Sequence, residues 1–278
     1  MRVGLIQMTS SDNPSENLEK TVALVHEAAA MGARFVLTPE VTNCVSASRT
    51  HQNEVLRCEA EDATLPALCQ LAAARGIWLL IGSLALKSDG DARFVNRSYL
   101  IAPTGEITAR YDKMHMFDVT LSETETYRES DGYKPGEHAV VAKLDGVQVG
   151  LSICYDVRFP YLYRDLAQQG TAILTVPSAF SPDTGPAHWE VLLRARAIET
   201  GSFVLAPAQT GAHSAVRGRA RRTWGHSLAI DPWGRVLADA GEGVGVTCVD
   251  LDLSLVADVR RRLPSLTHDR SYRMVQYE

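Results

Sequence analysis

Short apolar runs alternate along the chain with longer segments in which apolar residues recur every three or four positions. The run at residues 3–7 predicts a strand, and the spacing that follows predicts a helix from Asn13, a favoured N-cap, to Gly32, a favoured C-cap. The same criteria predict strands at residues 34–37, 77–86, 93–102, 106–110, 147–153, 172–176, 203–208, 227–230, 235–238 and 244–251. Further helices are predicted at residues 64–75, 159–169, 186–200 and 254–262.

Strands and helices interleave throughout the sequence, and turn-forming residues join two pairs of neighbouring strands. Pro103-Thr104-Gly105 and Asp231-Pro232-Trp233-Gly234 are typical of hairpin turns. No repeat, low-complexity tract or linker marks a boundary between domains. The pattern therefore predicts a single layered α/β domain that spans residues 1–278.

Composition and charge are those of an ordinary globular protein. Of the 278 residues, 45% are hydrophobic and 22% are charged, which is unlike a disordered chain or a coiled coil. The formal net charge is −5, so nothing indicates nucleic acid or an anionic membrane as a partner. The chain starts on strand-like sequence without a signal-peptide pattern, and its longest apolar segments are too short to cross a bilayer.

The cysteines indicate a reducing compartment. They are odd in number and show no Cys-x-x-Cys spacing, which argues against a disulfide framework and against a zinc site. The five are Cys44, Cys58, Cys69, Cys154 and Cys248. The eight histidines also lack the spacing of metal ligands. We therefore expect a cytoplasmic protein without a metal.

Glu40 follows the predicted strand at residues 34–37. Open α/β sheets place ligands at the carboxyl ends of their strands, so this carboxylate is a candidate general base. Burial at that position would raise its pKa toward the range of a working base. The alternative interpretation is an exposed acidic residue in a loop.

Cys154 lies between the predicted strand at residues 147–153 and a predicted helix that begins near Phe159. A thiol at a helix N-terminus lies near the positive end of the helix dipole, which favours the thiolate. Backbone N–H groups at such a position can also bind an oxyanion. Cys154 is therefore a candidate nucleophile, and the alternative is a small core residue.

Lys113 follows the second strand of the first predicted hairpin. If it is turned inward and held by a carboxylate, its ammonium group can stabilise an anionic intermediate. Glu129 is a candidate for that carboxylate. The alternative is a lysine on a solvated face.

Together, Glu40, Lys113 and Cys154 resemble the Glu–Lys–Cys triad of the nitrilase superfamily of carbon–nitrogen hydrolases. The surrounding motifs match as well, namely Leu37-Thr-Pro-Glu40, Tyr111-Asp-Lys-Met-His-Met-Phe-Asp118, Ile153-Cys-Tyr-Asp-Val-Arg-Phe-Pro160, Pro177-Ser-Ala-Phe180, Thr184-Gly-Pro-Ala-His-Trp-Glu190, Arg194-Ala-Arg-Ala-Ile198, Gly225-His-Ser227 and Asp231-Pro-Trp-Gly234. The resemblance runs from the first strand to Tyr272. Within the superfamily, the sequence is most similar to the Nit branch of small amidases, which includes deaminated glutathione amidase and ω-amidase.

The resemblance implies a fold and an assembly. The fold would be a four-layer α-β-β-α sandwich of the nitrilase type, normally dimerised into an eight-layer particle. The chain would form a homodimer or a higher homo-oligomer, with residues 264–278 as a tail at the dimer interface. Glu129 falls where the superfamily has a second glutamate bonded to the lysine. The resemblance implies no metal or organic cofactor, and a small-molecule amide rather than nucleic acid or membrane as the partner.

The resemblance also implies a reaction. Glu40 would take the proton of Cys154, and the sulfur would attack the terminal carboxamide of a small α-keto acid or peptide-like substrate. Lys113 and the backbone N–H of Tyr155 would hold the oxyanion. Glu40 would then protonate the departing ammonia and activate the water that hydrolyses the thioester. With Glu129 beside Lys113, we expect the shared proton to reside on Glu40.

Deaminated glutathione is the expected substrate, and an ω-amidase acting on 2-oxoglutaramate or succinamate is the alternative. Arg158 is the candidate for binding a substrate carboxylate, or else it forms a structural salt bridge. Phe180 and Thr184 are expected to line the pocket mouth. Two loops have unusual sequences, residues 41–46 and the basic run at residues 217–222. We expect both to border the pocket, the second as a mobile solvated loop or as a lid over an anionic substrate.

Three other functions remain open. A nitrilase is usually longer and has tryptophan after the nucleophile, where this chain has Tyr155. An N-carbamoyl amidohydrolase typically has an Asn-Asp pair there, against Tyr155-Asp156. A non-catalytic scaffold of the same fold would be expected to have lost part of the triad, of which all three members are present.

Overall fold

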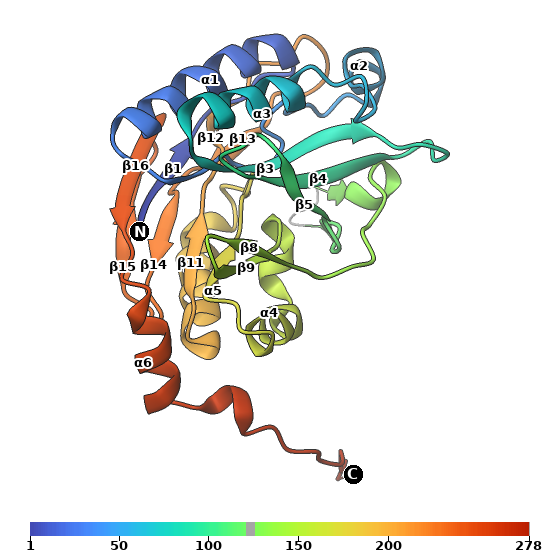
Figure 1. The fold of residues 1–278 in the computed structure, drawn as a ribbon. Helices are drawn as coiled ribbons and strands as arrows, with labels where there is room; N and C mark the ends of the chain where they lie inside the picture. Colours follow the sequence, from blue (N-terminus) through green and yellow to red (C-terminus); the bar gives the residue numbers. More distant parts are fainter. Residues whose placement is uncertain (121–125, 278) are drawn as a thin grey trace.

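The computed structural model describes residues 1–120 and 126–277 (Figure 1). Its strands are β1 (Arg2–Gln7), β2 (Phe35–Leu37), β3 (Trp78–Lys87), β4 (Phe94–Ile101), β5 (Ile107–Asp112), β6 (Asp118–Thr120), β7 (Thr126–Arg128), β8 (Val140–Leu144), β9 (Val147–Leu151), β10 (Ile173–Thr175), β11 (Phe203–Ala206), β12 (Thr210–Ala212), β13 (Arg222–Trp224), β14 (Leu228–Ile230), β15 (Val236–Asp239) and β16 (Gly245–Asp250). Its α-helices are α1 (Pro14–Ala30), α2 (Arg49–Val55), α3 (Thr64–Arg75), α4 (Pro160–Gln168), α5 (Gly185–Thr200) and α6 (Ser254–Arg262).

Two six-stranded sheets form the middle of the molecule. The first has the strand order β16-β1-β2-β3-β4-β5, and the second has the order β15-β14-β11-β10-β9-β8. Helices α1 and α3 cover the outer face of the first sheet, and α4 and α5 pack on the second (Figure 1). The expected four-layer α-β-β-α sandwich is therefore confirmed.

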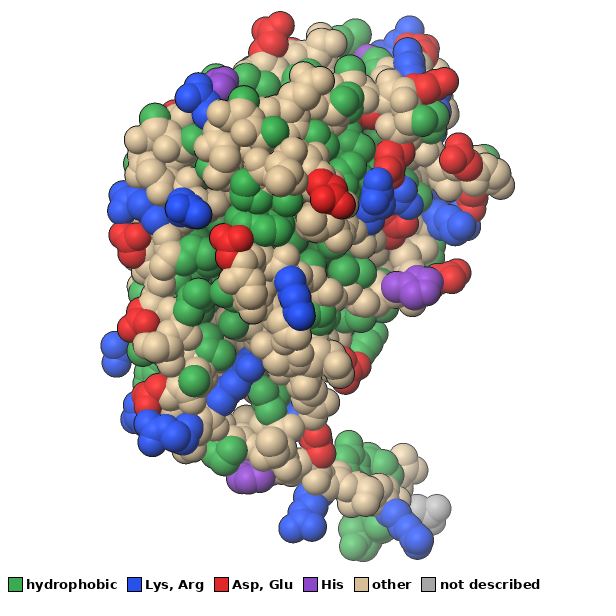
Figure 2. All heavy atoms as spheres, in the orientation of Figure 1, with side chains coloured by type: hydrophobic (Ala, Val, Ile, Leu, Met, Phe, Trp, Pro, Cys, Tyr) green, Lys and Arg blue, Asp and Glu red, His purple; other side chains and the backbone are tan. Residues whose placement is uncertain are grey.

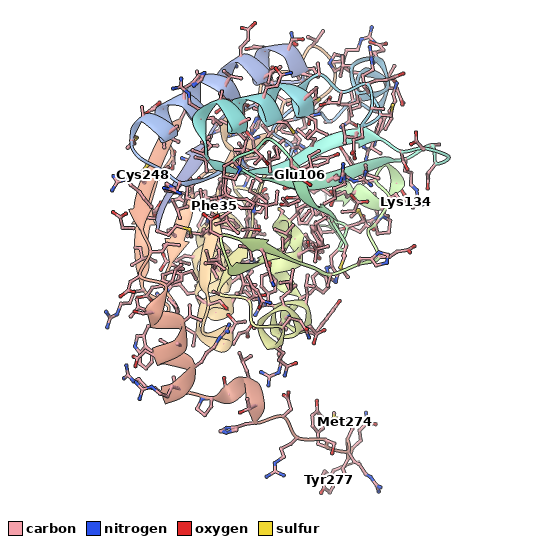
Figure 3. All side chains as sticks on the ribbon, viewed as in Figure 1. Phe35, Glu106, Lys134, Cys248, Met274 and Tyr277 are labelled. Carbon is pink, nitrogen blue, oxygen red and sulfur yellow. The ribbon has the colours of Figure 1, made fainter. Side chains whose placement is uncertain are left out.

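Alternate residues of the first sheet belong to different cores. In β1, Val3 and Leu5 belong to the apolar cluster shared with the second sheet, whereas Ile6 belongs to the cluster beneath α1 and α3. In β2, Phe35 (labelled in Figure 3) belongs to the cluster shared with the second sheet, and Val36 belongs to the cluster beneath α1 and α3. Because successive side chains of a strand point to opposite faces, a sheet covered on both faces needs apolar residues at consecutive positions. This need explains the uninterrupted apolar runs in the sequence.

Most predicted elements are present with small shifts at their boundaries. The side chain of Asn13 caps α1 by accepting hydrogen bonds from the N–H groups of Ser15 and Glu16, and Gly32 adopts a positive φ of 85° just beyond the helix. Strands β4 and β5 form one predicted hairpin, and β14 and β15 form the other. Helix α2 and strand β8 were not predicted, because the first is short and the second is an edge strand without a strong apolar pattern.

The last residues leave the body of the protein (Figures 1 and 2). Arg164 of α4 binds Asp269, and the backbone beyond that point makes no further described hydrogen bond to the body. Tyr272, Met274 and Tyr277 are more than four-fifths exposed. Figure 2 shows hydrophobic side chains on a C-terminal segment that stands apart from the main surface, and Figure 3 labels Met274 and Tyr277 there.

Candidate active site

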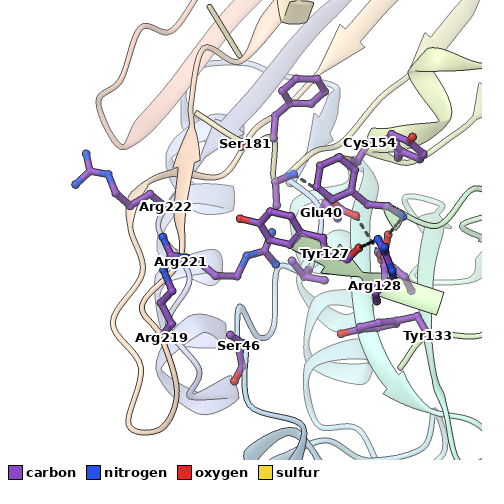
Figure 4. A pocket seen from close by; sticks show the side chains of 18 of the residues that line it. Glu40, Ser46, Tyr127, Arg128, Tyr133, Cys154, Ser181, Arg219, Arg221 and Arg222 are labelled. Carbon is purple, nitrogen blue, oxygen red and sulfur yellow. Dashed lines mark hydrogen bonds between the residues drawn. The ribbon is translucent and has the colours of Figure 1, made fainter. Parts of the chain in front are cut away.

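One cavity of about 510 Å³ opens where strands of both sheets end (Figure 4). Glu40 follows β2, Lys113 directly follows β5, and Cys154 follows β9. All three side chains line the cavity, and so do Glu129 and Tyr155. The fold thus brings together side chains that lie far apart in the sequence and come from two different sheets.

An ammonium group lies between two carboxylates in the buried part of this cavity. Lys113 Nζ is 2.9 Å from Oε1 of Glu40 and 2.9 Å from each carboxylate oxygen of Glu129. Oε2 of Glu129 also accepts the N–H of Phe117 at 2.6 Å. Lys113 is only 2% exposed and Glu40 only 4% exposed, so water screens these charges little.

The carboxylate of Glu40 is fixed at both oxygens. Asn96 Nδ2 donates to Oε1 at 2.9 Å, and the N–H of Ala179 donates to Oε2 at 2.8 Å. The thiol of Cys154 is hydrogen-bonded to the same carboxylate. Sequence reasoning missed Asn96, although a polar residue inside an otherwise buried strand was a signal that could have identified it.

Cys154 occupies a sharp turn between β9 and a 3₁₀-helix, Cys154–Arg158, which precedes α4. Its φ is 49°, in the left-handed region that residues with a Cβ seldom adopt, and such outliers cluster at functional sites. Its N–H donates to the carbonyl oxygen of Pro177 at 3.0 Å, which fixes the turn against the next strand. The side chain is 8% exposed and lines the cavity.

The expectation of a resting thiolate at Cys154 is wrong. Burial and the negative charge of Glu40 raise the pKa of the Cys154 thiol well above its usual value, and the ammonium of Lys113 does not compensate. The helix that begins at Cys154 is a short 3₁₀-helix rather than a long α-helix, so its dipole is small. The thiol is therefore neutral at pH 7.

The expectation that burial raises the pKa of Glu40 is also wrong. Burial acts in that direction, but the charge of Lys113 and the hydrogen bonds from Lys113 and Cys154 hold the pKa of Glu40 below its usual range. The pKa of Lys113 lies well above its usual value, because Glu129 and Glu40 outweigh the effect of burial. The proton between Cys154 and Glu40 thus resides on sulfur in the resting site, and not on Glu40 as expected.

Asp156 fixes the turn that carries Cys154. Its Oδ2 accepts the hydroxyl of Tyr111 at 2.6 Å and the N–H of Ile153 at 2.8 Å, and its Oδ1 accepts the N–H of His115 at 3.1 Å. The residue is fully buried. No role was predicted for Asp156, although an acid two positions after a candidate nucleophile was an available signal. Its contacts join the turn to the segment that contains Lys113.

An irregular register in β3 supports the segment that contains Glu40. Gly82 N–H donates to Thr38 Oγ1 at 3.0 Å, and Ser83 Oγ accepts the N–H of Val41 at 2.7 Å. A Cβ atom on Gly82 would lie 2.0 Å from the carbonyl oxygen of Thr38, a separation that no side chain tolerates. Glycine is therefore required where β3 approaches this segment.

Replacing Gly82 with alanine is expected to lower the free energy of unfolding by about 3 kcal/mol, because two backbone segments must move apart. Chemical denaturation measures the loss. The matched control is Gly243→Ala, since a Cβ there meets nothing within 4 Å, and its stability should stay close to that of the wild type. Equal stability of both variants would contradict the close approach at Gly82.

Phe180 and Thr184 line the cavity, whereas Arg158 is not among the described residues that line it. Thr184 Oγ1 is buried and has no hydrogen-bond partner among the described residues. The Arg158 guanidinium lies 5.8 Å from the ring centroid of Tyr155, and Nη2 is 3.3 Å from Nδ1 of His188. The guanidinium also lies 5.5 Å from the ring centroid of Phe180, so Arg158 contacts two residues that line the cavity, and its role in binding a substrate carboxylate stays a prediction.

The two loops with unusual sequences both border the cavity, as expected. Three residues of the loop at 41–46 line it, and so do residues 219–222 of the basic run. Arg217, in contrast, pairs with Glu54 of α2 at 2.7 Å on the surface. Residues 219, 220 and 222 are exposed and Arg221 is half-buried, so this part of the basic run is solvated and also lines the cavity.

The described residues contain neither a metal cluster nor a membrane-spanning helix. No group of three or more His, Cys, Asp or Glu side chains among them could hold a metal ion. None of the described helices has the length and apolar character needed to traverse a bilayer. All five cysteines are free thiols.

Comparisons with known proteins show similarity over nearly the whole chain. The model of the carbon–nitrogen hydrolase family matches residues 2–261. A deaminated glutathione amidase from Synechocystis sp. is 42% identical over 266 residues, which cover 95% of this chain and 96% of that protein. A deaminated glutathione amidase from Yersinia enterocolitica is 38% identical over 273 residues, which cover 96% of this chain and 92% of that protein.

A solved structure is similar at the level of the fold. The crystal structure of Saccharomyces cerevisiae Nit3, described as a member of branch 10 of the nitrilase superfamily, matches with a TM-score of 0.85 at 27% sequence identity. The match covers 98% of this chain and 97% of that one. The similarity therefore includes both sheets and the helices that cover them.

Proposed function

Because the chain belongs to the carbon–nitrogen hydrolase family, we propose that Cys154 is the nucleophile of an amidase that hydrolyses deaminated glutathione through a thioester. The reaction class is that of the family and of the relatives. The observation that carries the residue assignment is Lys113 between Glu40 and Glu129, with the Cys154 thiol hydrogen-bonded to Glu40. This arrangement supports the proposal, because it brings a carboxylate, a thiol and an ammonium group together in one cavity.

Acylation starts from the neutral thiol. Glu40 accepts the proton of Cys154 as the sulfur bonds to the amide carbon, and the carbonyl electron pair moves onto oxygen. Lys113 and the backbone N–H of Tyr155 stabilise this oxyanion, and the N–H of Tyr155 has no acceptor among the described residues. The low pKa of Glu40 keeps it ionised at neutral pH and able to accept the proton.

Deacylation uses the same carboxyl group. Protonated Glu40 donates its proton to the departing amine as the C–N bond breaks, which leaves a thioester on Cys154. Glu40 then takes a proton from water, and the water oxygen attacks the thioester carbon. Collapse of this second intermediate expels the sulfur of Cys154, which regains its proton from Glu40. The cycle consumes one water, releases an acid and an amine, and restores every residue.

The proposed substrate changes the expected leaving group. Deaminated glutathione carries an oxo group where the γ-glutamyl residue of glutathione has its amino group, so its first amide is the distal amide of an α-keto diacid. Hydrolysis of that amide gives 2-oxoglutarate and cysteinylglycine, not the ammonia that the sequence-based mechanism expected. The cavity volume, about 510 Å³, supports a ligand of this size, since such pockets range from ~300 to ~1,000 Å³.

Turnover of four compounds tests the proposal. Purified protein is mixed with deaminated glutathione, 2-oxoglutaramate, succinamate or a simple nitrile at equal concentration, and 2-oxoglutarate or ammonia is measured as the product requires. We expect kcat/KM for deaminated glutathione to exceed the other values by about 100-fold, roughly 2.7 kcal/mol in transition-state free energy. Preference for 2-oxoglutaramate would make the protein an ω-amidase. Hydrolysis of the nitrile alone, or of no compound, would refute the assignment.

We further propose that the chain is a single domain that forms a homodimer in the cytoplasm, with the tail after Leu263 packed on the partner subunit. The exposed apolar side chains of Tyr272, Met274 and Tyr277 support this role for the tail. The five free thiols support a reducing compartment. Sedimentation equilibrium of the intact chain measures its mass, and a monomer at micromolar concentration would contradict the dimer.

A further inference from the structure

The rim of the cavity is richer in cations than the proposed reaction requires. Among the described residues that line it, five arginines and one lysine face three carboxylates. The arginines are Arg49, Arg128, Arg219, Arg221 and Arg222, and the carboxylates are Glu40, Glu129 and Asp183. The lysine is Lys113, which Glu40 and Glu129 already engage. The proposed reaction mechanism therefore assigns no role to the five arginines.

Two of these arginines have structural contacts. Arg49 donates to Oε1 of Gln52 at 3.0 Å, and its guanidinium lies 4.9 Å from the ring centroid of Tyr133. Arg128 donates to the carbonyl oxygen of Tyr127 at 2.9 Å. Both guanidinium groups are thus held in place by the protein itself.

Arg221 differs from its two neighbours in the basic run. Figure 4 shows its side chain extending toward Tyr127 and the interior of the cavity, whereas Arg222 points away. Arg221 is half-buried, and Arg219 and Arg222 are exposed. The guanidinium of Arg221 forms no ion pair and donates no hydrogen bond to any residue in the described part of the chain. A half-buried cation aimed into a cavity without such a partner is suited to bind an anion.

The backbone around Arg221 is fixed. The N–H of His213 donates to the carbonyl oxygen of Arg221 at 2.9 Å, and the His213 ring binds the carbonyl oxygen of Ser10 at 2.7 Å. The N–H of Val216 donates to Oδ2 of Asp12 at 2.7 Å. Strands β12 and β13 pair directly beside this position. The guanidinium is therefore presented from an ordered position, which lowers the entropic cost of binding a ligand.

The net charge in the buried part of the cavity makes a cation at the rim, such as Arg221, necessary for binding an anionic substrate. With a neutral thiol at Cys154, the charges of Glu40, Glu129 and Lys113 sum to −1 in the buried part of the cavity. A substrate carboxylate that enters this field is repelled unless a cation at the rim compensates.

We propose that Arg221 binds the terminal carboxylate of the leaving dipeptide, a proposal that rests on the proposed function. The acyl half of the substrate is a five-carbon chain, and its carbonyl carbon must bond to Cys154, so this half lies in the buried part. The leaving half extends outward, and its glycine carboxylate is the group that reaches the rim. Arginine suits a carboxylate because its planar guanidinium can donate two parallel hydrogen bonds.

The test compares deaminated glutathione with its C-terminal N-methylamide, which lacks the carboxylate. In the wild type we expect a higher kcat/KM for the acid. In Arg221→Gln, KM for the acid should rise about 10- to 100-fold with kcat nearly unchanged, and the preference should disappear. Turnover of 2-oxoglutaramate, which has no leaving-side carboxylate, should not change. Arg221→Lys should retain part of the preference, since it keeps the charge without the planar fork.

The matched control is Arg217→Gln, which removes the same charge from the same basic run but only an exposed pair with Glu54. Its preference for the acid should equal that of the wild type. Equal wild-type turnover of the acid and the N-methylamide would overturn the role of Arg221 and leave the proposed function intact. If Arg221→Gln lowers the turnover of 2-oxoglutaramate as much as that of deaminated glutathione, then Arg221 binds the acyl half of the substrate, which would overturn the proposal. Absence of wild-type turnover on all three compounds would refute the proposed function and this inference with it.

Discussion

Replacing Cys154 with alanine is expected to lower kcat/KM by at least about 10⁴-fold, because the thioester forms on this sulfur. Cys44 also lines the cavity, but its thiol donates to the carbonyl oxygen of Asp12 and has no general base beside it among the described residues. The variant should fold normally, since alanine accepts the same backbone and removes only one buried sulfur atom. Steady-state turnover of deaminated glutathione measures the loss. Circular dichroism and thermal unfolding verify that the fold persists. Mass spectrometry of acid-quenched wild-type protein should show the acyl group on Cys154.

Cys69→Ala is the matched control for this experiment. Cys69 lies on α3, on the outer face of the first sheet, and is a free thiol outside the cavity. Its loss should leave kcat/KM within a factor of about two, because surface changes of this kind have small effects. Activity above one-tenth of the wild-type value in Cys154→Ala would contradict a cysteine mechanism at this position.

The layered fold could be predicted because local pattern and tertiary burial agree. The central strands, such as β2, β10 and β11, are buried on both faces, so their sequences are continuous apolar runs, and Asn13 and Gly32 mark the ends of α1 directly. Strand β8 gave no such signal, since an edge strand is covered less completely. The ends of β2, β5 and β9 surround one cavity because of the way in which the two sheets face each other. Sequence periodicity predicts the individual strands but not the relative placement of the sheets.

The charge states could not be predicted from neighbours along the sequence. The thiolate expectation considered the helix beside Cys154, and the expectation for Glu40 considered burial and the presence of Glu129 beside Lys113. The structure adds the direct contact of Lys113 with Glu40, at 2.9 Å, beside the expected contact with Glu129. Burial acts to raise the pKa of Glu40, but the charge of Lys113 and the hydrogen bonds to the carboxylate together lower it, while burial and the charge of Glu40 both raise the pKa of the Cys154 thiol.

Proximity in sequence guided the choice of Arg158 as the candidate for binding a substrate carboxylate. Arg158 lies four positions after Cys154, and its guanidinium lies against Tyr155 and Phe180, but it is not among the described residues that line the cavity. Arg221 lies 67 positions after Cys154, and the β12–β13 hairpin brings it to the rim. Only the three-dimensional structure distinguishes these two arginines.

Replacing Lys113 with methionine is expected to lower the free energy of unfolding by about 3–5 kcal/mol at pH 7, because it leaves Glu40 and Glu129 buried without their shared cation. Turnover should also fall by about 10²- to 10³-fold, since one oxyanion donor is lost. Chemical denaturation measures the first effect and steady-state kinetics the second. Lys134→Met is the control, because Lys134 is exposed and its loss should change stability by less than about 0.5 kcal/mol.

The stability loss in Lys113→Met should depend on pH with a defined sign. In the wild type the pKa of Glu40 is lowered, so its stabilising contribution is present above the unfolded pKa and is lost as pH falls through the folded pKa. In the variant the charge and the hydrogen bond of Lys113 are lost, and burial, the largest influence, outweighs the remaining hydrogen bonds from Cys154 and Ala179, so the pKa of Glu40 rises and protonation becomes stabilising in acid. The stability difference between the two proteins should therefore shrink between pH 7 and pH 4. Adding Glu129→Gln to Lys113→Met should recover part of the stability at pH 7 by removing one buried charge. A pH-independent difference would show that Lys113 contributes by packing rather than by balancing these carboxylates.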